Sequence, residues 1–265
     1  MLKLIVSDID GTLLPYGQTA ISPTLFDLIR RLQAAGILFC PASGRQYHSL
    51  RALFAPVADE VCFLCENGGV IFGPGKEESA PVLSKTAMPR PDALALSRDI
   101  MGIPECAVMI SGQNVSYVCG CEESFVRQLE NVQGNLVIRV ARVEDISEDI
   151  LKVTAFCPKN LDDPAAILGP RWGKTYHMAV AGPVWLDFGL ANKGAGLLGL
   201  CRALGISPAE TAAFGDNWND VSMLEAAGTA WLMDTAAPPL RERFPRQCTG
   251  VPEVLAAILK ELEAN

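Results

Sequence analysis

Two carboxylates lie close together near the start of the chain. Asp8 and Asp10 follow the apolar run at residues 4–6 and are separated by one residue. Residues two apart in an extended chain face the same way, so both carboxylates can converge on one point. Such a pair destabilises a fold unless a cation lies between the charges. Magnesium prefers oxygen ligands of this kind, although a solvated turn is also common where Asp precedes Gly.

A second acidic cluster lies far along the chain. Asp216, Asn219 and Asp220 follow a short apolar run and open a predicted helix. Asp220 alone would suit a helix N-terminal cap. Four carboxylates from two distant strand ends are harder to explain as caps, and together they predict a magnesium site. The predicted ligands are Asp8, Asp10, Asp216 and Asp220.

A phosphate site also needs hydroxyl, N–H or cationic donors. Ser43 and Gly44 supply a hydroxyl and backbone N–H groups at a strand–helix turn, the geometry that cradles anions. Lys193 is the one lysine at the start of a core helix, although a solvated surface role is commoner for a lysine without context. These donors indicate a phosphorylated ligand.

Two glycine patterns suggest nucleotide binding instead. Residues 169–175 resemble a P-loop, but three residues separate the glycines where four are needed. Gly194, Gly196 and Gly199 match Gly-x-Gly-x-x-Gly in full, and Asp216 could serve as the ribose-binding acid. A dinucleotide-binding oxidoreductase therefore stays open as an alternative, although close helix packing explains these glycines better.

The chain contains nine cysteines, and the pairs Cys62/Cys65 and Cys119/Cys121 raise the question of a zinc site. Structural zinc usually takes two recognisable ligand pairs, whereas the first pair lies in a strand-like run where residues three apart face opposite ways. We expect reduced, buried thiols. Only two histidines are present, so a serine–histidine catalytic triad is not expected.

Strand-like and helical patterns alternate at both ends of the chain. Apolar runs at residues 3–6, 37–42 and 61–65 each end in a polar turn, and residues 22–36 predict a helix between the first two. This order predicts an α/β fold with a Rossmann-like parallel sheet and helices on both faces. Ligands bind beyond the carboxyl ends of such strands. Residues at these ends are Asp8, Asp10, Ser43 and Asn67.

The middle of the chain has a different character. Residues 83–186 are rich in sheet-like alternation with helices between, which indicates a separate α+β unit. The first pattern resumes at about residue 187. We therefore expect a core formed by residues 1–82 and 187–265, interrupted by an inserted domain at 83–186.

The composition limits the possible partners. Of 265 residues, 22 are Lys or Arg and 30 are Asp or Glu, which gives a net charge of −8. This balance argues against a general nucleic-acid binder and against attraction to anionic membranes. No stretch of sequence is long and apolar enough to span a bilayer, and no secretory signal is expected, so a cytoplasmic protein is predicted.

The motifs resemble those of the haloacid-dehalogenase-like hydrolases. Residues 8–12, 43–45, 193–194 and 215–220 are similar to the family's four motifs, in the same order. Residues 66–69, with sequence Glu-Asn-Gly-Gly, and the large insertion after them resemble the Cof-like branch, in which a cap domain interrupts the core. The resemblance covers the chain from end to end.

The resemblance implies a phosphatase that forms an aspartyl-phosphate. Asp8 would be the nucleophile, and Asp10 would protonate the leaving oxygen and then activate water. Magnesium would be held by the Asp8 carboxylate, the Asp10 backbone carbonyl and Asp216, with support from Asp220. The residues that would bind phosphate or substrate are Gly11, Thr12, Ser43, Gly44, Arg45, Asn67, Lys193 and Asn219.

Two residues depart from the family pattern. Trp218 stands where the branch more often has a small residue, which could alter the packing of the metal-site loop. Ser43 is often threonine in relatives, a change that keeps the hydroxyl.

The expected substrate is a small phosphorylated metabolite of the sugar-phosphate class, selected by the cap. Arg171, Trp172 and Lys174 form a cationic, aromatic cluster in the cap, for which a solvated loop is the better explanation. A phosphotransferase or phosphomutase with the same intermediate stays open, since only the acceptor differs.

Overall fold

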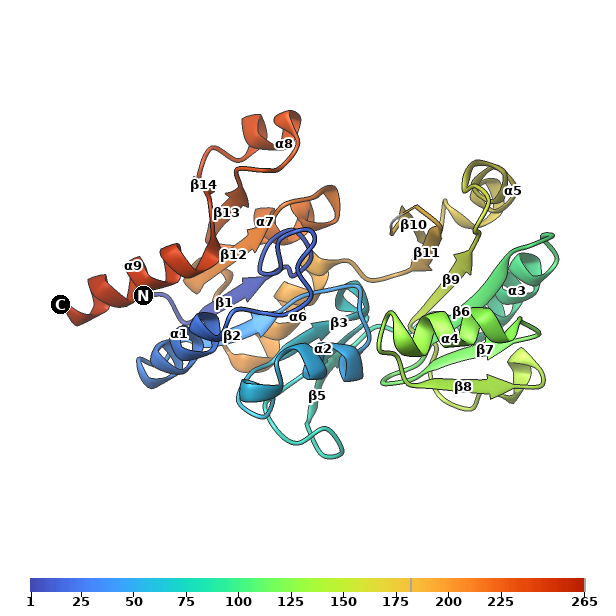
Figure 1. Ribbon diagram of the computed structural model, residues 1–265, viewed down its shortest axis with the longest axis horizontal. Helices are drawn as coiled ribbons and strands as arrows, with labels where there is room; N and C mark the ends of the chain where they lie inside the picture. The colour runs from blue at the N-terminus through green and yellow to red at the C-terminus, as the bar shows by residue number, and fades with distance from the viewer. Residues whose placement is uncertain (182, 265) are drawn as a thin grey trace. The chain divides into compact units, whose positions relative to one another are not determined.

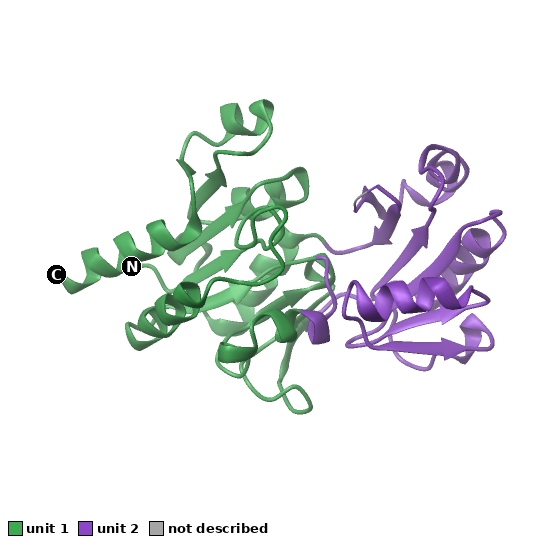
Figure 2. Ribbon diagram, in the orientation of Figure 1, with its two compact units in different colours: residues 1–43, 50–84, 192–265 green, residues 44–49, 85–191 purple. Residues whose placement is uncertain are grey.

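The computed structural model describes residues 1–181 and 183–264, which form two compact units (Figures 1 and 2). Unit 1 comprises residues 1–43, 50–84 and 192–265, and unit 2 comprises residues 44–49 and 85–191. The expected return to the core at residue 187 falls inside a strand of unit 2, β11 (Trp185–Gly189). The expected boundaries also did not separate residues 44–49 from the core.

Unit 1 is built on a parallel sheet of five strands, in the order β14-β13-β12-β1-β2. The interior strand β1 is buried along its whole length, and its last residue, Ser7, pairs with Phe214 of β12 on one side and Pro41 of β2 on the other. Three strands therefore end at one edge of the sheet. The strands are β1 (Leu4–Ser7), β2 (Leu38–Pro41), β12 (Thr211–Gly215), β13 (Thr229–Met233) and β14 (Gln247–Cys248).

A smaller sheet extends this edge. Its strands are β3 (Phe63–Cys65), β4 (Val70–Phe72) and β5 (Val82–Lys85), in that order. A parallel bridge between Ala42 and Leu64 links it to the chain just beyond β2. The turn that follows β3 is therefore brought to the same end of the fold as the turn that follows β2.

The helices that lie wholly in unit 1 are α1 (Pro23–Ala34), α6 (Lys193–Leu204), α7 (Val221–Ala226), α8 (Pro238–Arg243) and α9 (Val251–Glu263). Helix α2 (Tyr47–Leu53) begins in unit 2 and ends in unit 1. The expected helix over residues 22–36 is α1, which begins at Pro23 with Ser22 as its N-cap residue. An apolar cluster packs Leu4 and Val6 of β1 against Leu197 of α6 and Met223 of α7. Each such side chain contributes about 2 kcal/mol when fully buried.

Unit 2 contains one six-stranded sheet, in the order β10-β11-β9-β6-β7-β8. Neighbouring strands are antiparallel except β7 and β8, which run parallel. The other strands are β6 (Ala107–Ser111), β7 (Ser116–Cys119), β8 (Val137–Val140), β9 (Lys152–Phe156) and β10 (His177–Val180), and the helices are α3 (Arg90–Met101), α4 (Glu123–Asn131) and α5 (Asp162–Trp172). Val153 and Phe188 pack in the cluster that contains α3 and α5, whereas Met109 and Val118 pack with α4.

The structure decides between several interpretations of the sequence. None of the nine cysteines forms a disulfide; six are buried, as expected, whereas Cys106, Cys121 and Cys248 are partly exposed. Residues 169–173 lie at the end of α5, whereas a P-loop precedes its helix. A Cβ added at Gly194 would lie 2.3 Å from the Ser222 carbonyl oxygen, and one at Gly196 would lie 2.7 Å from Leu64 Cδ1. Close helix packing thus explains this glycine pattern. Among the described residues, no helix has the length and hydropathy needed to cross a membrane.

Candidate active site

Asp8 follows β1 directly, and its main chain is held on both sides. Its N–H donates to the Phe214 carbonyl oxygen at 2.9 Å, and the Ser7 hydroxyl donates to its carbonyl oxygen at 2.9 Å. Because β1 and β12 are paired up to this point, the carboxylate of Asp8 is presented at the edge of the sheet.

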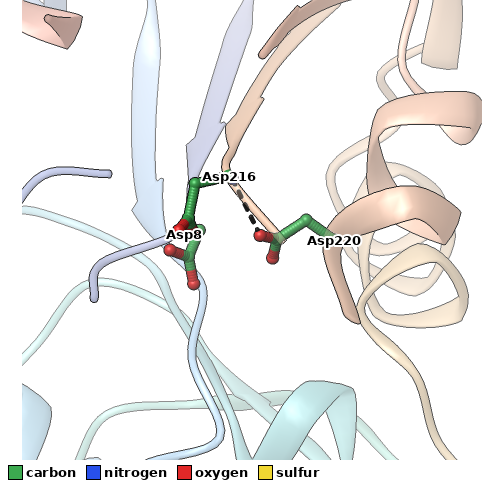
Figure 3. Close-up of side chains that lie close together, drawn as sticks. All are labelled: Asp8, Asp216 and Asp220. Carbon is green, nitrogen blue, oxygen red and sulfur yellow. Dashed lines mark hydrogen bonds between the residues drawn. The ribbon is translucent and has the colours of Figure 1, made fainter. Parts of the chain in front are cut away.

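Asp216 and Asp220 come from the turn that follows β12. One oxygen of Asp220 accepts the N–H groups of Asp216 and Asn217, both at 3.1 Å, so the turn closes on itself. The short 3₁₀ helix η5 (Trp218–Asp220) carries Asp220 back toward the strand end. Figure 3 shows Asp216 and Asp220 beside Asp8, with the hydrogen bond from the Asp216 main chain as a dashed line.

The three carboxylates form a compact, buried group. One oxygen from each of Asp8, Asp216 and Asp220 lies within 4.8 Å of the other two. The side chain of Asp10 is exposed and is not part of this group among the described residues. The expected contribution of Asp10 to a metal site was its backbone carbonyl, which stays a prediction.

Lys193 lies at the first position of α6 and is 1% exposed. Its ammonium donates to Asp220 Oδ1 at 2.6 Å and also to Asp8 Oδ1. Asn192 holds the start of this helix, since its side chain accepts the Ala195 N–H at 2.9 Å. Burial opposes charge on Lys193, but Asp220 and Asp8 outweigh it and raise its pKa, so the ammonium stays charged.

Asp8 has an unusual electrostatic environment. Burial raises its pKa to about 7 despite the opposing charge of Lys193, and Asp220 adds to the increase. Burial and Asp220 also raise the pKa of Asp216. Asp8 Oδ2 is buried and has no hydrogen-bond partner among the described residues, whereas buried polar atoms normally have one.

These features fit a hard divalent cation. Carboxylate oxygens are the ligands that Mg²⁺ prefers, and a positive charge beside them would favour the ionised form of all three groups. Three carboxylates with a single ammonium leave an excess of negative charge that a cation would balance.

Three residues of the first loop lie against the Asp216 side chain. Gly11 has a φ of +94°, and a Cβ there would lie 2.3 Å from Asp216 Oδ2, so only glycine fits. The Thr12 hydroxyl donates to Asp216 Oδ1 at 3.3 Å. The Tyr16 hydroxyl donates to Asp216 Oδ2 at 3.1 Å, and burial and Asp216 raise the pKa of Tyr16 to about 12. Sequence reasoning missed Tyr16, because a tyrosine in a polar loop carries no signal of such a contact.

The turns after β2 and β3 are joined to each other. Ser43 donates its N–H to the Leu64 carbonyl oxygen at 2.9 Å and accepts the Asn67 N–H at 2.9 Å. Asn67 has a φ of 54°, and its side-chain Oδ1 is buried with no hydrogen-bond partner in the part of the chain that the structure describes. Ser43 and Asn67 therefore lie side by side beyond the strand ends of unit 1, as sequence reasoning placed them.

The other predicted residues have different surroundings. Gly44 and Arg45 fall in unit 2, and Asn219 is exposed next to Trp218, whose side chain is 57% exposed. Their predicted contacts with phosphate stay predictions. In the cap, Arg171 Nη1 and Trp172 Nε1 both donate to Asp99 Oδ2 at 2.8 Å, so these two residues have a structural partner.

Comparison with known proteins gives a consistent result. The haloacid dehalogenase-like hydrolases match residues 5–252. The 5-amino-6-(5-phospho-D-ribitylamino)uracil phosphatase YbjI of Escherichia coli is 29% identical over 245 residues, which span 89% of this chain and 86% of that protein. The pyridoxal phosphate phosphatase YbhA of the same organism is 26% identical over 256 residues, 91% of each chain. A crystal structure from Eubacterium rectale has a TM-score of 0.86 and 28% identity, covering 97% of this chain and 99% of that one.

The family match covers the paired strand ends, the carboxylate group and the lysine described above. The expected fold, a parallel α/β core with an inserted α+β unit, agrees with the structural relatives. The chain belongs to the haloacid-dehalogenase-like hydrolases, in their Cof-like branch, and is a phosphatase.

Proposed function

We propose that the protein is a magnesium-dependent phosphatase that hydrolyses a sugar phosphate or a similar small phosphorylated metabolite through an aspartyl-phosphate on Asp8. One observation carries the proposal: the unpartnered oxygen of a buried Asp8, whose other oxygen is held by Lys193. A carboxylate fixed by one oxygen and open at the other is suited to nucleophilic attack.

Asp8, Asp216 and Asp220 would hold the magnesium ion, which would balance the negative charges of the carboxylates and of the phosphoryl group. In the first step Asp8 forms a bond to phosphorus as the ester bond to the leaving oxygen breaks. Asp10 gives its proton to that oxygen. In the second step water displaces the phosphoryl group from Asp8, and Asp10 takes the proton of the water.

Lys193 serves both steps. Its charge is secured by Asp220 and Asp8, and it stabilises negative charge on the transferring phosphoryl oxygens. Ser43 would donate its hydroxyl to the same oxygens. The unpartnered Oδ1 of Asn67 supports a role as an acceptor for a hydroxyl of the substrate.

The relatives support a phosphorylated small molecule without choosing one. YbjI is named for a substrate that carries a phosphorylated ribityl chain, and YbhA for pyridoxal phosphate. The two substrates share a phosphate ester on a small molecule. We carry over a phosphorylated polyol or sugar to this chain as a proposal, because the substrate of YbjI, the more similar of these two relatives, carries a ribityl chain.

The test is phosphate release from a panel of phosphorylated sugars, polyols and cofactors by the wild type and Asp8→Asn, with magnesium and with excess chelator. We expect turnover that needs both Asp8 and the metal. Hydrolysis by Asp8→Asn at the wild-type rate would refute the nucleophile, and full activity in chelator would refute the metal. A second alcohol in the assay would reveal phosphotransfer as a phosphorylated product.

A further inference from the structure

The segment Gly44–Ser49 belongs to unit 2, although Ser43 and Leu50 on either side of it belong to unit 1 (Figure 2). It comes directly after Ser43, which the proposed function assigns to phosphate binding. The conformation of this segment therefore determines the direction of the backbone immediately after Ser43.

Side chain–backbone hydrogen bonds hold the segment on the sheet of unit 2. The buried Gln46 pairs with the main chain of Leu136, accepting its N–H at 2.7 Å and donating to its carbonyl oxygen at 3.2 Å. Gln46 Nε2 also lies 3.1 Å from the Ser116 hydroxyl. The Ser49 hydroxyl donates to the Gln133 carbonyl oxygen at 2.6 Å. The segment is thus fixed at several points.

A buried lysine contacts the first residue of the segment. Lys152 Nζ donates to the Gly44 carbonyl oxygen at 3.2 Å and forms an ion pair with Asp187 Oδ2 at 3.2 Å. The Thr154 hydroxyl donates to Asp187 Oδ1 at 2.7 Å. Lys152 and Thr154 are two apart on β9, and Asp187 lies opposite Thr154 on β11, so all three share one face of the sheet.

The energetics of this pair point to a role other than stability. The side chains of Lys152 and Asp187 are 8% and 9% exposed. A buried ion pair contributes little net stability, because desolvation offsets the attraction, and apolar replacements of similar volume are often neutral. What the ammonium does supply is a directional, charge-assisted hydrogen bond to a backbone carbonyl.

That hydrogen bond orients a peptide group of the turn. The Gly44 carbonyl and the Arg45 N–H belong to one planar trans peptide, so fixing the direction of the carbonyl fixes the direction of the N–H. Gly44 has no side chain, so its backbone dihedral angles are not restricted locally. A contact from another part of the unit can restrict them instead. Lys152 is therefore placed to set the conformation of residues 43–45.

We propose that Lys152, held by Asp187 and Thr154, is a positioning residue that orients the turn at residues 43–45 for binding the phosphate of the substrate. The inference rests on the proposed function, which gives Ser43 a phosphoryl oxygen to bind. Lys152 acts through the turn and not on the reacting atoms.

The test uses the double variant Lys152→Met/Asp187→Asn, which removes both charges and leaves an acceptor for Thr154. We expect KM for the best substrate and the inhibition constant of inorganic phosphate to rise together by about tenfold, with kcat changed less than about threefold. Lys152→Arg keeps a donor and recovers most of the affinity. Lys159→Met, which removes a lysine from an exposed ion pair with Glu105 in the same unit, serves as the matched control and leaves both constants unchanged.

A second measurement does not depend on turnover. Hydrogen exchange of the amides in residues 43–49 is expected to be faster in the double variant and unchanged in Lys159→Met. Thr154→Val, which frees Asp187 but keeps both charges, is expected to shift KM and exchange in the same direction by a smaller factor. Wild-type KM, phosphate inhibition and exchange in the double variant would overturn the inference. An inactive wild type would refute the proposed function, and the exchange rates would still decide the positioning role.

Discussion

Each unit of the molecule contains a buried lysine paired with acidic side chains, but the charge balance differs between the two. In unit 1, Lys193 contacts Asp8 and Asp220, and a third carboxylate lies close by. In unit 2, Lys152 pairs with Asp187, and the other oxygen of that carboxylate accepts a neutral hydroxyl. The first group carries an excess of negative charge, whereas the second is balanced.

The comparison separates a chemical site from a positioning device. An excess of buried negative charge is costly unless a cation is bound, and the raised pKa of Asp8 and its unpartnered oxygen are two signs of that cost. Lys152 and Asp187 pair one positive charge with one negative charge, and the same ammonium donates to the Gly44 carbonyl oxygen. Variants that change one group and leave the other intact test this difference.

The largest effect is expected for Lys193→Met. We predict that turnover falls by about 10³-fold, because the phosphoryl charge loses its cation. The free energy of unfolding without metal should fall by about 3–5 kcal/mol, because Asp8 and Asp220 lose their buried partner. Steady-state kinetics and denaturant unfolding measure the two effects, with Lys260→Met on the exposed face of α9 as the control. A Lys193→Met variant with wild-type turnover and stability would contradict the role assigned to Lys193.

A smaller effect is expected when the carboxylate group is displaced sterically. Gly11→Ala should lower turnover by about 10²-fold, since its Cβ would meet Asp216 Oδ2 at 2.3 Å. Gly17→Ala is the matched control, because Gly17 has a similar φ of +88° and nothing within 4 Å of the added Cβ. Both variants carry backbone strain of about 1 kcal/mol, so equal loss of activity in the two would show that strain and not the site is responsible.

The effect of pH on metal binding follows from Asp8. Its pKa rises from 3.8 in the unfolded chain to about 7 in the fold, so the folded state holds a proton that the unfolded state lacks between these values. This group's contribution to stability without metal is present below about pH 4 and is lost as pH rises through about 7. Magnesium must displace that proton, so it should raise the melting temperature more at about pH 8 than at about pH 5.5. Equal shifts at the two pH values would contradict the raised pKa.

The smallest change is expected for the balanced pair. Lys152→Met/Asp187→Asn should alter the free energy of unfolding by no more than about 1 kcal/mol, because the lost attraction and the avoided desolvation offset each other. Denaturant unfolding of the variant beside the wild type measures the change. A loss of several kcal/mol would show that the pair stabilises the fold and would contradict the contrast between the two lysines.

The parts of the fold and site that sequence reasoning found have local signals. Asp8, Asp216 and Lys193 lie at strand or helix ends, and their positions follow from the rule that parallel strands end together. The helix at Pro23 follows from its apolar period and its start signal. The parallel core could be predicted because buried strands alternate with helices.

The parts that sequence reasoning missed depend on long-range contacts. Gln46 forms a hydrogen bond with Leu136, 90 residues away in the sequence. Lys152 forms one with Gly44, 108 residues away. A lysine in a strand of alternating polar and apolar residues is usually solvated, so the sequence around Lys152 does not predict that its side chain is buried. The predicted boundary at residue 187 divides the strand Trp185–Gly189, and only its pairing with β9 assigns the whole strand to the cap.

The central claim is that the excess negative charge of unit 1 exists to bind a divalent cation. Calorimetric titration of Mg²⁺ into the wild type and Asp216→Asn tests it without knowledge of the substrate. We predict one bound ion in the wild type, with proton release that grows as pH falls below about 7, and strongly weakened binding in Asp216→Asn. No binding to the wild type, or equal binding by both proteins, would contradict it.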